Sequence, residues 1–363
     1  MTPGELAMLI RAVIEEAAEA GLLPLSVDQV PAEITIERPK SPEHGDYATN
    51  IAMRLARPTG WPPRQVAGVV ADALAKRSGI SSVDVAGPGF INIRIEAAAA
   101  GRLAAQIVRQ ADRYGRTQAL AGQKINVEFI SANPTGPLHL GHTRWAAVGD
   151  AIAAVLDAAG AEVVREFYVN DRGIQMQRFG ESLAAVAHGQ PPPADGYHGG
   201  YVVDLAAEIV ALDPSLLELS GEEAAEAFRE IGYQRQLQQQ RVVLDLFGTH
   251  FDAWVSEREL HESGGVKQAL KTLKKQSHVF RRDGATWLRT TDFGDDKDRV
   301  LVKADGELTY FASDCAYYLD KRRRGFDVAI YLLGADHHGY VNRLKAVAAC
   351  AGDDPDRNIE VLI

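Results

Sequence analysis

Two histidines three residues apart are the residues whose type and spacing most directly suggest chemistry. His139 and His142 lie in the segment "SANPTGPLHLGHTRWAAVGD", residues 131–150. Imidazoles at this spacing could ligate a metal ion, could donate hydrogen bonds to a phosphate, or could be there by chance. A zinc site needs three or four ligands, and the other histidines show no ligand spacing to this pair. We therefore expect no metal site and favour phosphate binding.

The segments on either side of the histidines predict the elements that position them. Residues 124–131, "KINVEFIS", form an apolar strand. Residues 144–160 place apolar side chains on one helical face and end at a glycine. Residues 162–171, "EVVREFYVND", predict the next strand. Strand, helix and strand make a βαβ unit, which begins a doubly wound, Rossmann-like parallel sheet.

A helix that begins at the carboxyl edge of such a sheet suits an anion. Its first turn has free backbone N–H groups and the positive end of the helix dipole. His139 and His142 on that turn could donate hydrogen bonds to phosphate oxygens whose charge grows in a transition state. Gly141 between them would leave room for a flat ring against the backbone. The sequence holds no P-loop motif, so a P-loop ATPase is excluded.

The length of 363 residues predicts two or three domains. Residues 1–115 alternate helical and strand patterns, which predicts a small α/β N-terminal domain. Residues 116–363 predict the doubly wound parallel-sheet domain, with an α/β insertion at about 185–305. Within the insertion, a long polar-faced helix precedes short strands joined by Asp-Gly turns, which predicts a small separate sheet.

Composition narrows the functional classes. The net charge of −10, from 39 basic and 49 acidic residues, argues against unspecific coating of nucleic acid. Two local basic clusters remain, each either a nucleic-acid patch or a solvated helix end: Lys271, Lys274 and Lys275 with Arg281 and Arg282, and the run Lys321–Arg324. No apolar run approaches the ~20 residues of a membrane helix. Two cysteines give no disulfide framework, so we expect a cytoplasmic protein without membrane contact.

Several segments taken together resemble arginyl-tRNA synthetases. "HLGH" is similar to the first ATP motif of class I aminoacyl-tRNA synthetases, although nucleotidylyltransferases carry a similar short motif. The wider segments "VEFISANPTGPLHLGHTRWAAVGDAIA", "EFYVNDRGIQM", "GELTYFASDCAYYLDK" and "LLGADHHGYVNRLKAV" resemble that family's catalytic domain. "SPEHGDYATNIAMRLA" and "AGPGFINIRI" resemble its additional, tRNA-contacting N-terminal domain. The resemblance covers nearly the whole chain, in the family's order.

The resemblance implies an arginine–tRNA ligase. L-arginine would react with ATP to give arginyl-adenylate, and the arginyl group would pass to tRNA(Arg). ATP would enter with Mg²⁺ as a substrate, and no tightly bound cofactor is implied. The partners would be tRNA(Arg), L-arginine and ATP, and we expect a monomer. The chemistry would be mostly positioning and charge stabilisation.

The resemblance also assigns roles around the histidines. His139 and His142 would be catalytic and would contact the ATP phosphates, with Gly141 beside them. Ser131 and Asn133, together with His142, would hold the amino-acid part of arginine.

A second group of residues would bind the rest of the substrates. Tyr310 and Asp314 lie one helical turn apart and would read the guanidinium group. Glu128 would be a second carboxylate for that pocket, unless it is a strand residue on the solvent side. Asp336 would contact the ATP ribose and His337 the amino group of arginine, although the two assignments could be exchanged.

One departure from the family pattern bears on activity. The family's KMSKS-like loop and helical anticodon-binding domain are expected after "NIEVLI", and "KTLKK" at 271–275 is not that loop. We therefore expect a portion of a longer enzyme that binds arginine but binds ATP poorly. Two alternatives stay open, a nucleotidylyltransferase acting on a small phosphorylated substrate and a non-catalytic tRNA-binding fragment or paralogue.

Overall fold

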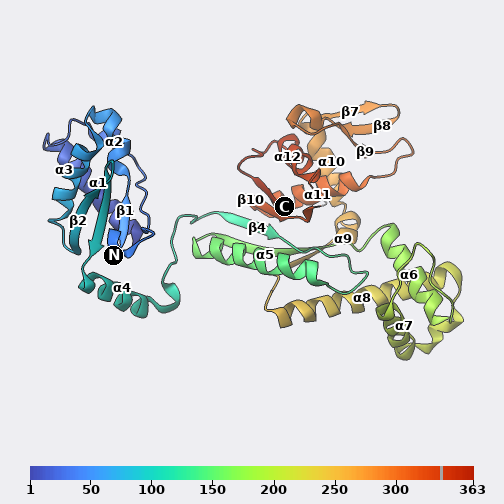
Figure 1. Ribbon diagram of the computed structural model, residues 1–363. Coiled ribbons are helices and arrows are strands. Elements are labelled where there is room, and N and C mark those ends of the chain that lie inside the picture. Colours follow the sequence, from blue (N-terminus) through green and yellow to red (C-terminus); the bar gives the residue numbers. More distant parts are fainter. Residues whose placement is uncertain (336–337) are drawn as a thin grey trace. The chain divides into compact units, whose positions relative to one another are not determined.

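The computed structural model describes residues 1–335 and 338–363. The chain divides into two compact units, Met1–Gly115 and Arg116–Ile363 (Figure 1). Each unit has its own hydrophobic core.

The first unit packs helices against a three-stranded antiparallel sheet with the strand order β1-β3-β2. Its elements are α1 (Pro3–Glu19), β1 (Tyr47–Thr49), α2 (Ile51–Thr59), α3 (Pro63–Leu74), β2 (Ile80–Ala86), β3 (Phe90–Ile95) and α4 (Ala97–Gln110).

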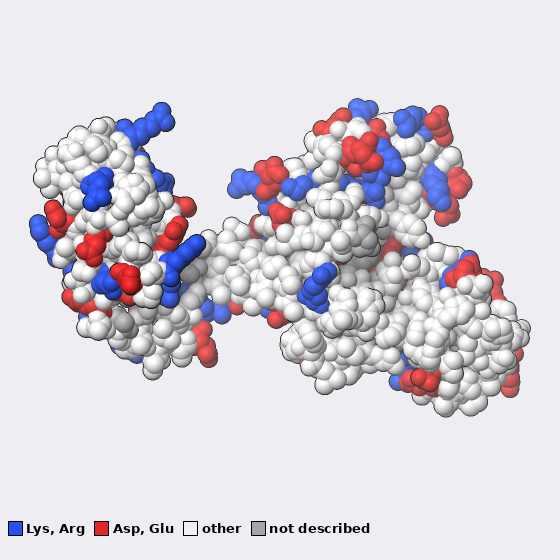
Figure 2. All heavy atoms as spheres, in the orientation of Figure 1, with Lys and Arg blue, Asp and Glu red and all other residues white. Residues whose placement is uncertain are grey.

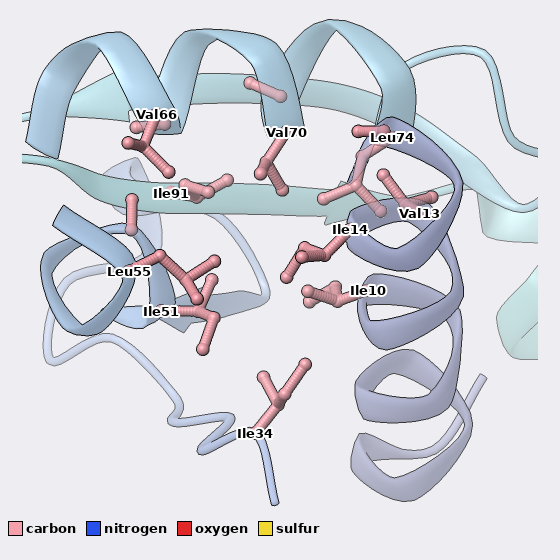
Figure 3. Packing of buried hydrophobic residues seen from close by; sticks show 14 of the residues in the cluster. Ile10, Val13, Ile14, Ile34, Ile51, Leu55, Val66, Val70, Leu74 and Ile91 are labelled. Atoms are coloured by element: carbon pink, nitrogen blue, oxygen red, sulfur yellow. The ribbon is translucent and has the colours of Figure 1, made fainter. Parts of the chain in front are cut away.

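Helix α1 shows how the sequence builds this unit. Thr2 caps it, because the Thr2 hydroxyl accepts a hydrogen bond from the Glu5 backbone N–H while the Glu5 carboxylate accepts from the Thr2 N–H. Every third or fourth residue of the helix is buried, which gives one apolar face. In Figure 3, Ile10 and Ile14 on that face point toward the side chains of α2 and α3.

The second unit is built on a five-stranded parallel sheet with the order β11-β10-β4-β5-β6. In chain order, the strands of this sheet and the helices that connect them are β4 (Lys124–Glu128), α5 (Leu140–Ala158), β5 (Glu162–Val169), β6 (Ala253–Ser256), α9 (Glu257–Glu262), α10 (Gly265–Lys275), α11 (Tyr310–Arg323), β10 (Val328–Leu332), α12 (Tyr340–Cys350) and β11 (Ile359–Leu362). After β4, the chain adds β5 and β6 on one side of it and then β10 and β11 on the other side. The direction of strand addition therefore reverses between β4 and β10. Open α/β sheets bind ligands at such a switch point. The predicted doubly wound fold is confirmed.

Strand β4 separates two chemical environments because successive side chains point to opposite faces of a sheet. Ile125 and Val127 pack with residues of α5 in one apolar core. Asn126 and Glu128 lie on the other face, where their partner is Lys321 of α11. One face of the central strand is therefore apolar and the other is polar yet buried.

The region expected to be one insertion is in two parts. Helices α6 (Ile174–Ala187), α7 (Gly200–Leu212) and α8 (Gly221–Phe247) pack on one another between β5 and β6. A separate antiparallel sheet follows α10, made of β7 (Val279–Arg282), β8 (Ala285–Leu288) and β9 (Arg299–Val302). Strand β6 lies inside the expected range but belongs to the main sheet. Its four residues are too few to show a period in the sequence.

Within residues 1–335 and 338–363, no helix has the length and apolar character needed to cross a bilayer.

Gly149 of α5 provides a test of the packing between helix and sheet. A Cβ atom at Gly149 would overlap the ring of Phe129, which is fully buried. We expect Gly149→Ala to destabilise the protein by about 1–3 kcal/mol through overpacking, although alanine favours helix. Gly68→Ala in α3 is the matched control, because nothing lies within 4 Å of its Cβ position. Denaturant unfolding should show Gly68→Ala unchanged or stabilised, and equal effects of the two changes would contradict this packing.

Candidate functional site

His139 and His142 cap the start of α5 as a reciprocal pair. The His139 Nδ1 atom accepts a hydrogen bond from the Gly141 N–H at 3.2 Å, and the His142 Nδ1 atom accepts from the His139 N–H at 3.1 Å. The two ring centroids are 3.9 Å apart. Both Nδ1 atoms act as acceptors, so each neutral ring carries its proton on Nε2. The helix start therefore offers two imidazole N–H donors.

The electrostatics keep His142 neutral. Burial lowers its pKa, and the neighbouring His139 lowers the pKa further. A neutral imidazole N–H can donate a hydrogen bond to a developing oxyanion, and because the ring is uncharged it has no bound anion that the substrate must displace. Among the described residues, no group of three or more His, Cys, Asp or Glu side chains could hold a metal ion.

Gly141 serves the histidine pair itself. A Cβ atom at this position would lie 2.9 Å from the Cε1 atom of His139. The flat ring for which the glycine leaves room in this structure is the imidazole of His139.

The loop between β4 and α5 begins at a strained corner. Ile130 and Ser131 both have positive φ angles, +68° and +44°, which non-glycine residues rarely adopt. The Ser131 hydroxyl donates to a Glu128 carboxylate oxygen at 3.2 Å and accepts from the Tyr168 N–H at 3.1 Å. Ser131, expected to hold the substrate, is thus anchored to the ends of two strands.

Helices of the insertion hold the next part of this loop. Gln240 of α8, 1% exposed, donates to the carbonyl oxygens of Asn133 and Gly136 at 3.0 and 2.9 Å. The Tyr201 hydroxyl of α7 donates to the Thr135 carbonyl oxygen at 3.0 Å. The Asn133 side chain, a predicted substrate contact, donates to Gln175 at 2.6 Å. None of the insertion residues was identified from the sequence.

Asp314 belongs to a group of carboxylates beside α11. Burial raises its pKa to about 7; Arg343 acts in the opposite direction, while Glu257 and Glu128 add to the rise. Burial also raises the pKa of Glu257, against hydrogen bonds from Ser313 and Tyr168. Carboxylates with raised pKa values are poised to accept a cation.

Glu257 and Tyr168 were missed in the sequence and are central to this group. Glu257 is 3% exposed and follows β6, and Tyr168 lies near the end of β5. Both residues lie at the carboxyl end of a strand, where the binding sites of parallel sheets form, and this position could have identified them. Because residues 253–256 were not recognised as a strand of the main sheet, that signal was not visible.

Tyr310 lies at the first residue of α11 and is 64% exposed. Its hydroxyl passes close over Gly173, where an added Cβ atom would lie 3.1 Å from it. The Tyr310 side chain is therefore accessible to a ligand at the start of α11, whereas Asp314 is half-buried one turn further along the helix. Asp336 and His337 lie outside the described residues, so their roles stay predictions.

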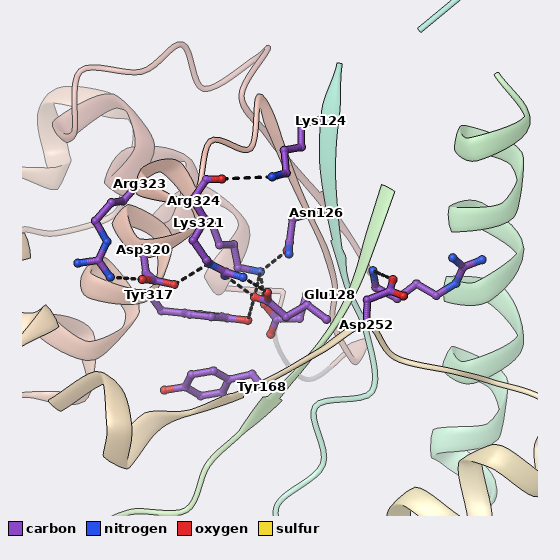
Figure 4. A network of polar contacts seen from close by, with 12 residues as sticks. Lys124, Asn126, Glu128, Tyr168, Asp252, Tyr317, Asp320, Lys321, Arg323 and Arg324 are labelled. Atoms are coloured by element: carbon purple, nitrogen blue, oxygen red, sulfur yellow. Dashed lines mark hydrogen bonds and ion pairs between the residues drawn. The ribbon is translucent and has the colours of Figure 1, made fainter. Parts of the chain in front are cut away.

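Glu128 is buried, with 6% of its surface exposed, so the alternative of a solvent-facing strand residue is wrong. Its carboxylate accepts from the Lys321 ammonium group at 2.6 Å (Figure 4). In register beside it, Glu166 of β5 accepts from the Tyr317 hydroxyl at 2.5 Å and from Arg324 at 2.5 and 3.0 Å. This set is a network of ions in which Lys321, Glu128 and Glu166 are buried and Arg324 is half-buried.

Most of the basic run at the end of α11 is paired within the fold. Lys321 is fully buried, Arg322 donates to both carboxylate oxygens of Asp353 at 2.9 and 3.0 Å, and Arg324 pairs with Glu166. Arg323 is exposed and pairs with Asp320 on the same helix, as expected of a solvated helix end. The lysines of the other cluster are exposed at the end of α10. Figure 2 shows acidic side chains interspersed with basic ones over the part that holds α10–α12.

The comparison with known families agrees with this architecture. Residues 104–190 and 215–361 match the family described as tRNA synthetases class I (R), catalytic domain, so sheet, switch point and "HLGH" helix are those of a class I tRNA synthetase. Residues 4–95 match the arginyl tRNA synthetase N terminal domain. The chain belongs to the arginyl-tRNA synthetase family.

Individual relatives give the same result. The chain is 56% identical over 363 residues to an arginine–tRNA ligase of Renibacterium salmoninarum and 54% identical over 365 residues to one of Micrococcus luteus. Each alignment covers 100% of this chain and 66% of the relative. The arginyl-tRNA synthetase of Thermus thermophilus shares the fold, with a TM-score of 0.68 at 22% identity over 100% of this chain and 65% of that one.

The buried network predicts a specific acid sensitivity. Burial alone would raise the pKa of Glu166, but Lys321 and Arg324 lower it to about 2. The stability that the Glu166 carboxylate contributes is therefore complete above its ordinary pKa of about 4.5 and is lost as the pH falls toward 2. Between pH 5 and pH 3, the unfolding free energy of Glu166→Gln should fall less steeply than that of the unaltered protein. The two slopes should differ by up to about 1.4 kcal/mol per pH unit.

Glu162→Gln on the same strand is the control, because Glu162 is exposed. Urea titrations at several pH values measure both slopes. A Glu166→Gln slope as steep as that of the unaltered protein would contradict the lowered pKa.

Proposed function

We propose that the protein activates L-arginine with ATP and transfers the arginyl group to tRNA(Arg). One observation carries the proposal: the same sheet domain combines the buried carboxyl groups of Asp314 and Glu257 with two imidazole N–H donors at the start of α5. The first suits a cation and the second a phosphate. A substrate pair of arginine and ATP needs both.

The arginine end rests on charge and shape. A guanidinium group is a planar cation whose N–H groups match a carboxylate, and Asp314 and Glu257 supply carboxylates close to one another. The exposed Tyr310 hydroxyl at the rim adds an acceptor. Ser131 and Asn133 would hold the amino-acid part, with Asn133 exchanging its contact to Gln175 for the substrate.

The ATP end rests on the helix start. An arginine carboxylate oxygen attacks the α-phosphorus of ATP, the bond to pyrophosphate breaks, and arginyl-adenylate forms. The two Nε2–H groups and the helix N-terminus would stabilise the charge on the phosphate oxygens. A terminal ribose hydroxyl of tRNA(Arg) then attacks the arginyl carbonyl carbon, and AMP leaves. Mg²⁺ would enter bound to ATP.

The tRNA contact would involve the first unit. Its match to the N-terminal domain of the arginyl family supports this proposal. A nucleotidylyltransferase accounts for the helix start but leaves both this unit and the anionic pocket without a role. A monomeric state and a cytoplasmic location stay predictions from the sequence.

Exchange of labelled pyrophosphate into ATP tests the proposed reaction. In the full-length enzyme, the exchange should require L-arginine and should rise when tRNA(Arg) is added. Exchange that runs without arginine, or that needs a small phosphorylated substrate, would support the nucleotidylyltransferase instead.

Asp314 gives the recognition step a defined pH dependence. Its pKa of about 7 means that the unliganded carboxyl is protonated below neutral pH, and only the carboxylate pairs with guanidinium. Arginine affinity should therefore rise with pH up to about 7 and level off above it. Asp314→Asn should weaken binding by about 1.5–3 kcal/mol at pH 8 and abolish the pH dependence.

Calorimetric titration with arginine at pH 6, 7 and 8 measures both effects. Asp320→Asn on the same helix is the control, because the Asp320 carboxylate pairs with Arg323 and Arg324. If Asp314→Asn keeps the affinity and pH profile of the unaltered protein, Asp314 is not part of the pocket.

In a full-length enzyme, His142→Ala should slow arginyl-adenylate formation by about 10²–10³, because it removes a preorganised donor to the transition state. The fold should be intact, since the His142 side chain accepts one backbone hydrogen bond, from the N–H of His139 just before α5. His250→Ala is the control, because this exposed histidine pairs with Asp245 outside the site. Rate loss of equal size in both variants, or unfolding of His142→Ala with release of zinc, would contradict the assignment.

A further inference from the structure

We propose that Lys321 is a positioning residue for substrate binding, acting through Glu128 on the Ser131 corner of the arginine pocket. The inference rests on the proposed function.

The ammonium group of Lys321 is buried, and its contacts fix its position. Lys321 is 0% exposed, and its Nζ atom lies 2.6 Å from the Asn126 side-chain oxygen, 2.6 Å from Glu128 and 3.3 Å from Glu166. The ammonium group donates hydrogen bonds to Asn126 and Glu128 and forms an ion pair with Glu166. A charge buried this deeply is held in one place, because every displacement would break a charged hydrogen bond without water to replace it.

The aromatic rings around the ammonium group restrict it further. The Nζ atom lies 4.4 Å from the ring centroid of Tyr317 and 4.2 Å from that of Tyr331. Cations interact favourably with such ring faces. Figure 4 shows Lys321 reaching from α11 to the strands, where Glu128 and Asn126 meet it. The ammonium group thus fixes one oxygen of Glu128 relative to α11, the helix that carries Tyr310 and Asp314.

The second step leads from Glu128 to the loop. The other carboxylate oxygen of Glu128 accepts from the Ser131 hydroxyl, and that hydroxyl accepts from the Tyr168 N–H. Ser131 and Ile130 adopt positive φ angles that cost energy, so the corner persists only where its surroundings hold it. The Lys321–Glu128 pair stabilises the corner through the hydrogen bond between Glu128 and Ser131.

The third step separates positioning from general stability. The network has two branches, since Glu166 is paired with Arg324 as well as Lys321. Arg324 shares Glu166 with Lys321, and its other ion-pair partner is Asp320 of α11 rather than Glu128, the residue that contacts Ser131. Removal of either cation should therefore destabilise the fold, whereas removal of Lys321 alone should disturb the pocket.

Two readouts test this difference in the whole protein. The amide of Tyr168 reports the corner directly, because its N–H donates to Ser131. Lys321→Met and Ser131→Ala should each speed hydrogen exchange of that amide and weaken arginine binding in calorimetry by about tenfold or more. Arg324→Met, the matched control, should lower the unfolding midpoint while Tyr168 exchange and arginine affinity stay as in the unaltered protein. The double variant Lys321→Met/Ser131→Ala should bind arginine no more weakly than the weaker single variant, because both changes act on one path.

The outcomes distinguish the inference from the proposed function. If the unaltered protein does not bind arginine, the proposed function fails, and Tyr168 exchange still tests the positioning. If it binds arginine and Lys321→Met binds it equally well with unchanged Tyr168 exchange, Lys321 is only structural and the inference is wrong. Should Lys321→Met not fold, Glu128→Gln weakens the same link with one atom exchanged, and unchanged Tyr168 exchange in that variant overturns the inference.

Discussion

The burial of one ammonium group against two carboxylates is the constraint on which the arrangement of the strand ends and α11 depends. Lys321 joins α11 to Glu128 of β4 and Glu166 of β5, and these strands carry the two loops that form the site. Pairs of this kind add little net stability compared with apolar packing, but they are costly to break and so define one arrangement. The constraint fixes the relation between the strand ends and α11. The helix that carries Asp314 therefore keeps one register against the loop that carries Ser131.

The site places opposite electrostatic demands on one sheet edge. Around Asp314 and Glu257 the protein leaves carboxylates with raised pKa values, which a cation can relieve. At the start of α5 it presents two imidazoles that accept backbone hydrogen bonds at Nδ1, and burial lowers the pKa of His142. Imidazole N–H donors suit a developing oxyanion. The carboxylates of Glu128 and Glu166 are instead compensated from within. Internal cations thus determine which acidic groups are left for a substrate.

The sequence was sufficient for the elements whose pattern is local. The apolar period of 144–160, the "HLGH" segment and the paired strands predict α5 and the parallel sheet without knowledge of contacts. Long-range relations were not accessible in this way. Strand β6 is four residues long, so its membership of the main sheet, and with it the position of Glu257, depends on pairing with β5. The run Lys321–Arg324 has the composition of a surface patch, yet its partners Glu128, Glu166 and Asp353 are distant in sequence. Gln240 likewise meets the loop only through the fold.

We propose that the carboxylates beside α11 recognise a guanidinium cation, and the most direct measurement compares the binding of arginine with that of citrulline. Citrulline has nearly the same shape, but its ureido group is uncharged. Calorimetric titration of the protein at pH 8 should show arginine binding and citrulline binding at least about tenfold more weakly, as expected from the loss of a charged hydrogen bond. Equal affinity for the two ligands would contradict a pocket that acts through the charges of Asp314 and Glu257.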